Sequence, residues 1–145
     1  MPSPIAAKVN FFFDEVPVNL RNRKGLKKFI EFIFKNEEKE LKSINYVFCS
    51  DKKLLKINKA YLNHNYFTDI ITFDLSNHKA PVEAEVYISI DRVKENARSL
   101  KESFNQELHR VIFHGALHLC GYKDKTVIDK TEMRNMEKKY LGLYP

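Results

Sequence analysis

The stretch from His114 to Asp124 reads His-Gly-Ala-Leu-His-Leu-Cys-Gly-Tyr-Lys-Asp. Its two histidines are four positions apart, so on an α-helix they lie one above the other on the same face. Gly121 can adopt the left-handed backbone conformation that closes a helix and reverses the chain. The stretch therefore predicts a helix end at which His114, His118 and Asp124 come together.

These three side chains have the chemistry of a metal site. Zinc accepts imidazole nitrogens and carboxylate oxygens, and a catalytic zinc takes three protein ligands and leaves one position to water. We therefore interpret His114, His118 and Asp124 as the ligands of one zinc ion per chain. A single helical histidine is usually structural, whereas this pair with its glycine and carboxylate favours a metal site. Asp124 has a competing role, because a residue beyond a helix end commonly caps or turns the chain.

Composition is that of an ordinary globular protein. The 145 residues suit a single domain over 1–145, with 43% hydrophobic and 30% charged residues. The net charge of +6 permits a polyanionic partner such as RNA without demanding one. The two cysteines form no disulfide framework, and we expect Cys120 to be a small buried hydrophobe. The first ten residues do not resemble a signal peptide and no stretch is apolar enough to span a bilayer, so we expect a cytoplasmic protein without membrane contact.

Hydrophobic periodicity gives an ordered series of strands and helices. Strands are expected at 8–13, 43–49, 70–75 and 83–90, and helices at 20–35, 52–62, 91–100, from about 103 and from about 126. The order β-α-β-α-β-β-α-α-α predicts an α+β domain, a mixed four-stranded sheet with about five covering helices. One of these is the zincin-like helix that carries the histidines.

Local signals define the expected helix starts. Helix N-caps are predicted at Ser50, Asp91, Ser103 and Thr126, because serine, threonine and aspartate side chains accept hydrogen bonds from free backbone N–H groups. In the helix over 52–62, the apolar spacing places Tyr61 on the inner side.

The histidine spacing also matches the zincin pattern H-E-x-x-H-x-x-G-x-x-H. Asp124 stands in place of the final histidine, and Gly115 stands where a metallopeptidase keeps its glutamate base. Peptide hydrolysis by the usual route needs that carboxylate. The metal ligands are therefore predicted without the peptidase base.

The same stretch resembles the YbeY-type endoribonucleases, whose hallmark is H-G-x-L-H-L-x-G-Y-D-H. Nine positions of that pattern are fixed and this chain keeps seven, the departures being Lys123 for aspartate and Asp124 for histidine. A carboxylate at the third ligand position preserves metal binding in principle. The alternative that the metal site has been lost stays open at this point.

A second family segment, N-x-x-Y-R-x-K-D-x-P-T-D-V-L-S-F, is matched by residues 58–73. Leu62 replaces the family arginine and His64 replaces the lysine. His64 lies in the loop that the family places over its cleft, so we expect it to contact phosphate or to donate a proton, unless it is a plain exposed loop histidine. Arg110, one turn before His114, is the candidate phosphate clamp, with a structural arginine as the alternative. His109 points off the histidine face and is not expected to be a ligand.

The resemblance implies a metal-dependent, single-strand-specific endoribonuclease. It would act on the 3′ end of small-subunit ribosomal RNA and on defective ribosomes, with ribosomal RNA and ribosomal proteins as partners. Two alternatives are a zinc metallohydrolase of other specificity, such as a peptidase, and a ribosome-associated assembly factor whose zinc is structural. The native metal, the general base, the cleavage position and the oligomeric state are not determined by the sequence.

Overall fold

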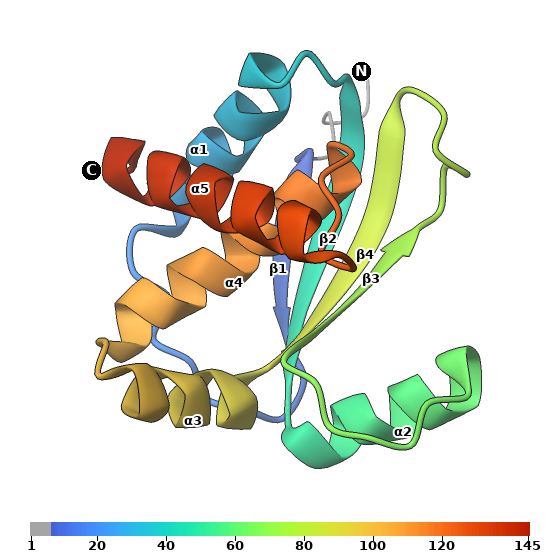
Figure 1. Ribbon diagram of the computed structural model, residues 1–145, viewed down its shortest axis with the longest axis vertical. Helices are drawn as coiled ribbons and strands as arrows, with labels where there is room; N and C mark the ends of the chain where they lie inside the picture. Colours follow the sequence, from blue (N-terminus) through green and yellow to red (C-terminus); the bar gives the residue numbers. More distant parts are fainter. Residues whose placement is uncertain (1–6) are drawn as a thin grey trace, which may run out of the picture.

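A four-stranded sheet runs through the molecule with its strands in the order β1–β2–β4–β3 (Figure 1). The strands are β1 (Val9–Phe13), β2 (Leu41–Cys49), β3 (Ile70–Asp74) and β4 (Val82–Ser89). The first two and β4 are parallel, whereas β3 pairs antiparallel with β4. The predicted mixed sheet is confirmed.

The computed structural model describes residues 7–145 of the chain. Most of the segment over 1–10, for which no signal peptide is expected, lies outside the described residues. Within 7–145, no helix is both long enough and apolar enough to cross a membrane.

Five helices complete the predicted order of elements. They are α1 (Arg23–Asn36), α2 (Asp51–Leu62), α3 (Ile90–Leu100), α4 (Phe104–Leu119) and α5 (Val127–Leu143). The main core joins α1, α3, α4 and α5 to one face of the sheet, where Val86 and Ile88 of β4 are buried. On α2, Leu54 and Ile57 instead pack with Cys49 and Ile71 in a smaller, separate cluster. The α+β architecture thus has four helices on one face and α2 on the other.

Helix α4 is the central element of the larger layer. It contacts α1, α3 and α5 as well as β3 and β4, and α5 lies across it (Figure 1). Its inner side chains are fully buried, among them Leu108, Ile112 and Phe113. Cys120, at its C-terminal end, is buried and unpaired, as predicted. Because α4 is packed on several sides, the polar side chains on its remaining face are held in fixed positions.

The helix starts follow the predicted caps with one exception. Side chains of Ser50, Ser103 and Thr126 cap α2, α4 and α5. The prediction for α3 was wrong: Ser89 is the N-cap, and its Oγ accepts a hydrogen bond from the Arg92 N–H at 3.1 Å. The helix starts one residue early because Ile90 is buried in the core. Asp91 instead accepts a hydrogen bond from the Asp51 N–H at 2.8 Å and so ties α3 to α2.

Tyr61 does not lie on the inner side of α2, as its spacing predicted. Its residue surface is 74% exposed, and its ring forms a T-shaped pair with Phe73, with 6.0 Å between centroids. Leu54 and Ile57, two turns and one turn earlier, already fill the space over the sheet. The last turn of α2 therefore presents its apolar residues to solvent.

Candidate metal centre

The two histidines of the motif lie on the C-terminal half of α4. His114 is partly buried, with 17% of its side chain exposed, and His118, one turn later, is exposed. Between them Gly115 is buried against the sheet. A Cβ at this position would lie 3.0 Å from Ile70 Cδ1 and 3.2 Å from a Val86 methyl. The close approach of helix and sheet explains why no glutamate stands here, because its side chain would have to displace β3 and β4 side chains.

The chain reverses directly after His118. Gly121 has a φ of 111°, and its N–H donates to the His118 carbonyl at 3.0 Å. The Tyr122 N–H donates to the Leu117 carbonyl at 3.1 Å. These two bonds form a Schellman motif, in which glycine takes the left-handed position. The Tyr122 hydroxyl donates to the carboxylate of Glu37 at 2.7 Å, which fastens the turn to the end of α1.

Both imidazoles are oriented through Nδ1. His114 Nδ1 lies 2.7 Å from Glu137 Oε2, and His118 Nδ1 lies 3.1 Å from the Tyr122 carbonyl oxygen. A carbonyl and an ionised carboxylate can only accept hydrogen bonds, so each Nδ1 is the donor, and in the neutral ring Nε2 then keeps its lone pair. Histidines that bind metals use this arrangement, in which an outer acceptor fixes the tautomer. The donor chemistry of both residues therefore fits a metal ion.

Asp124 returns to His114 and leaves His118 apart. Its Oδ2 is 3.4 Å from His114 Nε2, and about half of the Asp124 side chain is exposed. Within residues 7–145, no three His, Cys, Asp or Glu side chains are gathered closely enough to hold one ion. His114 and Asp124 line one pocket, whereas His118 lines another beside His78. The structure thus pairs two of the three predicted ligands and places the third one helical turn further on.

A network of buried carboxylates stands behind His114. Arg110 is bound bidentately by Glu107, with Nε–Oε1 and Nη2–Oε2 distances of 2.7 Å. Its Nη1 donates to Glu137 at 3.1 Å, and Nη2 lies 3.8 Å from Asp69. Glu107 and Glu137 expose only 1% and 3% of their side chains. Each nitrogen of the Arg110 fork is therefore engaged with a carboxylate of the protein.

The charges of this network shift one another's pKa values. Burial by itself raises the pKa of Glu137, but the hydrogen bond from His114 and the charge of Arg110 outweigh it, so the pKa of Glu137 is lowered. Burial also dominates at Asp69, where the pKa is raised despite the nearby charge of Arg110. Glu137 is thus held ionised as the acceptor of the His114 hydrogen bond.

Sequence reasoning did not identify Glu107 or Glu137. One signal was present in the sequence. Glu137 stands between Met133 and Tyr140 on the buried stripe of α5, where a charged residue needs a buried partner. Which partner it meets depends on how α5 crosses α4, which the sequence pattern does not give.

A pocket of about 280 Å³ opens beside His114. Its lining residues come from α4, α5 and the loop between them: Arg110, His114, Asp124, Lys130, Met133, Arg134 and Glu137. Lys130 and Arg134 are exposed cations one turn apart on α5. The pocket therefore combines the candidate ligands with positive charge that suits a phosphate group.

His64 lies elsewhere, in the loop between α2 and β3. Its Nδ1 is 2.9 Å from the Tyr66 hydroxyl, and the two rings stack with 5.1 Å between centroids. Its backbone N–H donates to the Asn58 carbonyl. Within residues 7–145, no hydrogen bond or ion pair joins His64 to His114, His118 or Asp124.

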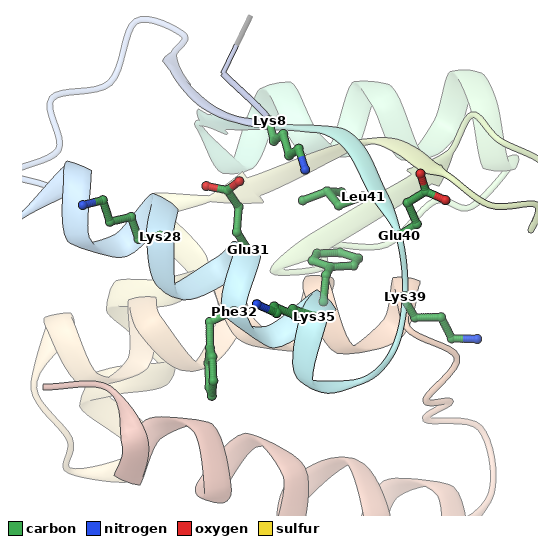
Figure 2. Close-up of a pocket in the computed structure, with 9 residues that line it drawn as sticks. Lys8, Lys28, Glu31, Phe32, Lys35, Lys39, Glu40 and Leu41 are labelled. Atoms are coloured by element: carbon green, nitrogen blue, oxygen red, sulfur yellow. The ribbon is translucent and has the colours of Figure 1, made fainter. Parts of the chain in front are cut away.

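A larger pocket lies away from the motif. It measures about 540 Å³ and lies between α1 and the chain that leads into β2 (Figure 2). Four lysines and two glutamates border it, namely Lys8, Lys28, Lys35, Lys39, Glu31 and Glu40. It contains no histidine or cysteine and none of the motif residues. The smaller pocket at His114 is the candidate site because of its chemistry and not its size.

Comparison with known proteins gives consistent matches along most of the chain. Residues 11–144 match the family model described as Endoribonuclease YbeY. The chain is 46% identical over 133 residues to the Endoribonuclease YbeY of Cytophaga hutchinsonii, covering 92% of this chain and 93% of that protein. It is 44% identical over 135 residues to the protein of the same name from Porphyromonas gingivalis, covering 93% and 89%. The solution structure of TM1509 from Thermotoga maritima superposes with a TM-score of 0.64 at 28% identity, covering 92% of this chain and 86% of that one.

Proposed function

This chain belongs to the YbeY endoribonuclease family, and on that premise we propose that it cleaves single-stranded RNA during ribosomal RNA maturation. The reaction is hydrolysis of RNA phosphodiester bonds. Its substrate is the 3′ end of small-subunit ribosomal RNA, and it also acts on the RNA of defective ribosomes. The protein works in the cytoplasm with ribosomes or ribosomal proteins as partners, and residues 1–145 form one functional domain.

We assign one zinc ion per chain to His114, His118 and Asp124, which requires His118, one helical turn from the His114–Asp124 pair in this structure, to join the same ion. The support is the hydrogen bond of each histidine Nδ1 to an acceptor, which leaves both Nε2 atoms available. Asp124 supplies a carboxylate oxygen on the side of His114 Nε2. Zinc bound there would supply Lewis acidity to the phosphodiester and to the attacking water.

The surrounding residues have separate roles in this proposal. Glu137 holds the His114 ring in one tautomer, and Arg110 holds Glu137, so Arg110 is a positioning residue in place of the phosphate clamp expected from sequence. Lys130 and Arg134, at the mouth of the pocket, bind the RNA backbone phosphates. His64 remains the candidate proton donor, on the loop between α2 and β3.

One observation carries the proposal. His114 is held by the buried Glu137 through Nδ1 while its Nε2 faces Asp124, inside a pocket whose rim is basic. If His114 had only a structural role, its Nε2 would not need to face a pocket lined with cationic side chains. A peptidase is disfavoured because Gly115 is packed against the sheet where the glutamate base would have to stand.

The test compares wild type with His114→Ala and with His109→Gln, a histidine of the same helix that stacks on Phe113. Metal content is measured by elemental analysis, and cleavage is measured on single-stranded and duplex ribosomal RNA fragments. We expect zinc and cleavage to be lost together in His114→Ala and kept in His109→Gln. Cleavage that persists in the metal-free variant would overturn the mechanism. Zinc without any RNA cleavage in wild type would favour the assembly factor with structural zinc.

A further inference from the structure

Three aromatic side chains are exposed where α2 leads into β3. Tyr61 in the last turn of α2 is 74% exposed, and Tyr66 and Phe67 in the following loop are 55% and 52% exposed. We call these three residues the aromatic surface. Large exposed rings on one short segment favour a surface at which a protein binds a partner. Figure 1 shows this loop passing below the sheet on its way from α2 to β3.

The two loop rings are held in position by neighbours. Tyr66 stacks on His64 at 5.1 Å with 21° between the ring planes, and its hydroxyl is 2.9 Å from His64 Nδ1. The guanidinium of Arg92 lies 5.3 Å from the centre of the Phe67 ring. The Tyr66 carbonyl accepts a hydrogen bond from the buried Asn58 amide at 2.9 Å. Rings fixed in this way lose little conformational freedom when a ligand stacks on them.

Positive charge lies on α2, the helix whose last turn carries Tyr61. Helix α2 exposes four lysines, namely Lys52, Lys53, Lys56 and Lys59. Its one acidic residue, Asp51, is bound by Arg92 at 2.7 Å and by the Ser89 hydroxyl at 3.0 Å. Rings beside cations are the combination that binds single-stranded nucleic acid, where bases stack and phosphates pair with lysine. An apolar peptide has no anionic groups that could pair with the four lysines.

The loop is also fastened to the candidate site. Asp69, two residues after Phe67, lies 3.8 Å from Arg110 Nη2 and accepts a hydrogen bond from the Asn96 amide at 3.2 Å. Arg110 in turn holds Glu137, which holds His114. A strand of RNA on the aromatic surface is therefore placed by a segment that ends at the network behind the metal centre.

We propose that Tyr66 and Phe67 stack the bases of the single-stranded RNA substrate while its backbone follows the lysines of α2. The inference rests on the proposed ribonuclease function and names the surface that recognises unpaired RNA. Bases in a duplex are stacked on one another and paired, so their faces are not available to these rings. Tyr61 extends the same surface onto α2.

The test is equilibrium binding of a labelled single-stranded RNA of about 12 nucleotides with 2′-O-methyl riboses. Fluorescence anisotropy is read on the full-length protein, and a denaturing gel verifies that the RNA stays intact. Tyr66→Ala and Phe67→Ala should each weaken binding by about fivefold or more, because each removes one stacked base contact. Tyr66→Phe keeps the ring and should bind as wild type does. Phe12→Ala is the matched control, since Phe12 on β1 is equally exposed at 51% and lies outside the aromatic surface.

An RNA with abasic sites separates stacking from charge, because it keeps every phosphate. Wild type should bind this RNA more weakly than either alanine variant binds normal RNA, and on the abasic RNA the variants should bind about as well as wild type. Unchanged single-strand affinity in both alanine variants would overturn the inference and leave the surface to a protein partner. The proposed function fails on a different result, the absence of RNA cleavage by wild type, which leaves the binding comparison readable. Both side chains are more than half exposed, and unfolding midpoints check that the variants are folded.

Discussion

His114 and His118 are one helical turn apart on α4, yet the protein holds them in different ways. His114 is fixed by a carboxylate that exposes 3% of its side chain and comes from another helix. His118 is fixed by a backbone carbonyl of its own turn, four residues away, and is open to solvent. One candidate ligand thus depends on a buried ion network, and the other depends on local backbone geometry.

This difference between His114 and His118 predicts how the site responds to substitutions. Buried charges are stable only as a set, so loss of one member leaves its partners unpaired in a medium of low polarity. A substitution in the turn behind His118 leaves no buried charge unpaired. It changes only the conformational preference of the turn itself. We therefore expect changes behind His114 to cost far more than changes behind His118.

Removal of Arg110 should give the largest effect. Arg110→Ala leaves Glu107 and Glu137 buried without their cation, which should destabilise the fold by about 3–5 kcal/mol. Urea denaturation measures the loss. Arg98→Ala is the control, because the Arg98–Glu95 pair is exposed and should contribute below about 1 kcal/mol. Equal losses in the two variants would mean that the Arg110 network is not held as a buried set.

A milder change tests how Glu137 acts on His114. Glu137→Gln keeps the side-chain volume but removes the charge that accepts from Nδ1 at 2.7 Å. Zinc affinity, measured by competition with a chromogenic chelator, should fall by about 10- to 100-fold. Glu132→Gln, an exposed glutamate on the same helix, should leave the affinity as it is. An unchanged affinity in Glu137→Gln would show that His114 does not need its carboxylate partner.

The smallest effect is expected at the turn behind His118. Gly121→Ala places a side chain at a φ of 111°, which should cost about 1 kcal/mol or somewhat more in stability. Apart from its chain neighbours, no heavy atom of residues 7–145 lies within 4 Å of the added Cβ, so the cost is conformational and not steric. Gly142→Ala on α5, also in open space but without a positive φ, should show no loss in thermal unfolding. A loss at Gly121 as large as that of Arg110→Ala would remove the contrast between the two halves of the site.

Much of the fold could be predicted because hydrophobic periodicity is local. The order of nine elements, the mixed sheet and three of the four caps followed from spacing and from side-chain capping chemistry. Asp91 and Tyr61 were placed wrongly for one reason. Their positions depend on what packs beside them, Ile90 in the core and Leu54 with Ile57 over the sheet.

The features of the candidate site likewise separate into local ones and ones that depend on tertiary packing. The sequence determined that His114 and His118 share a helix face and that Gly121 reverses the chain, because helix pitch and glycine's freedom at positive φ are properties of short segments. Only the tertiary structure decided that Glu137, 23 residues further along, orients His114 and that Arg110 is committed to carboxylates. Such contacts depend on how α5 crosses α4, and that crossing is set by the packing of the whole core.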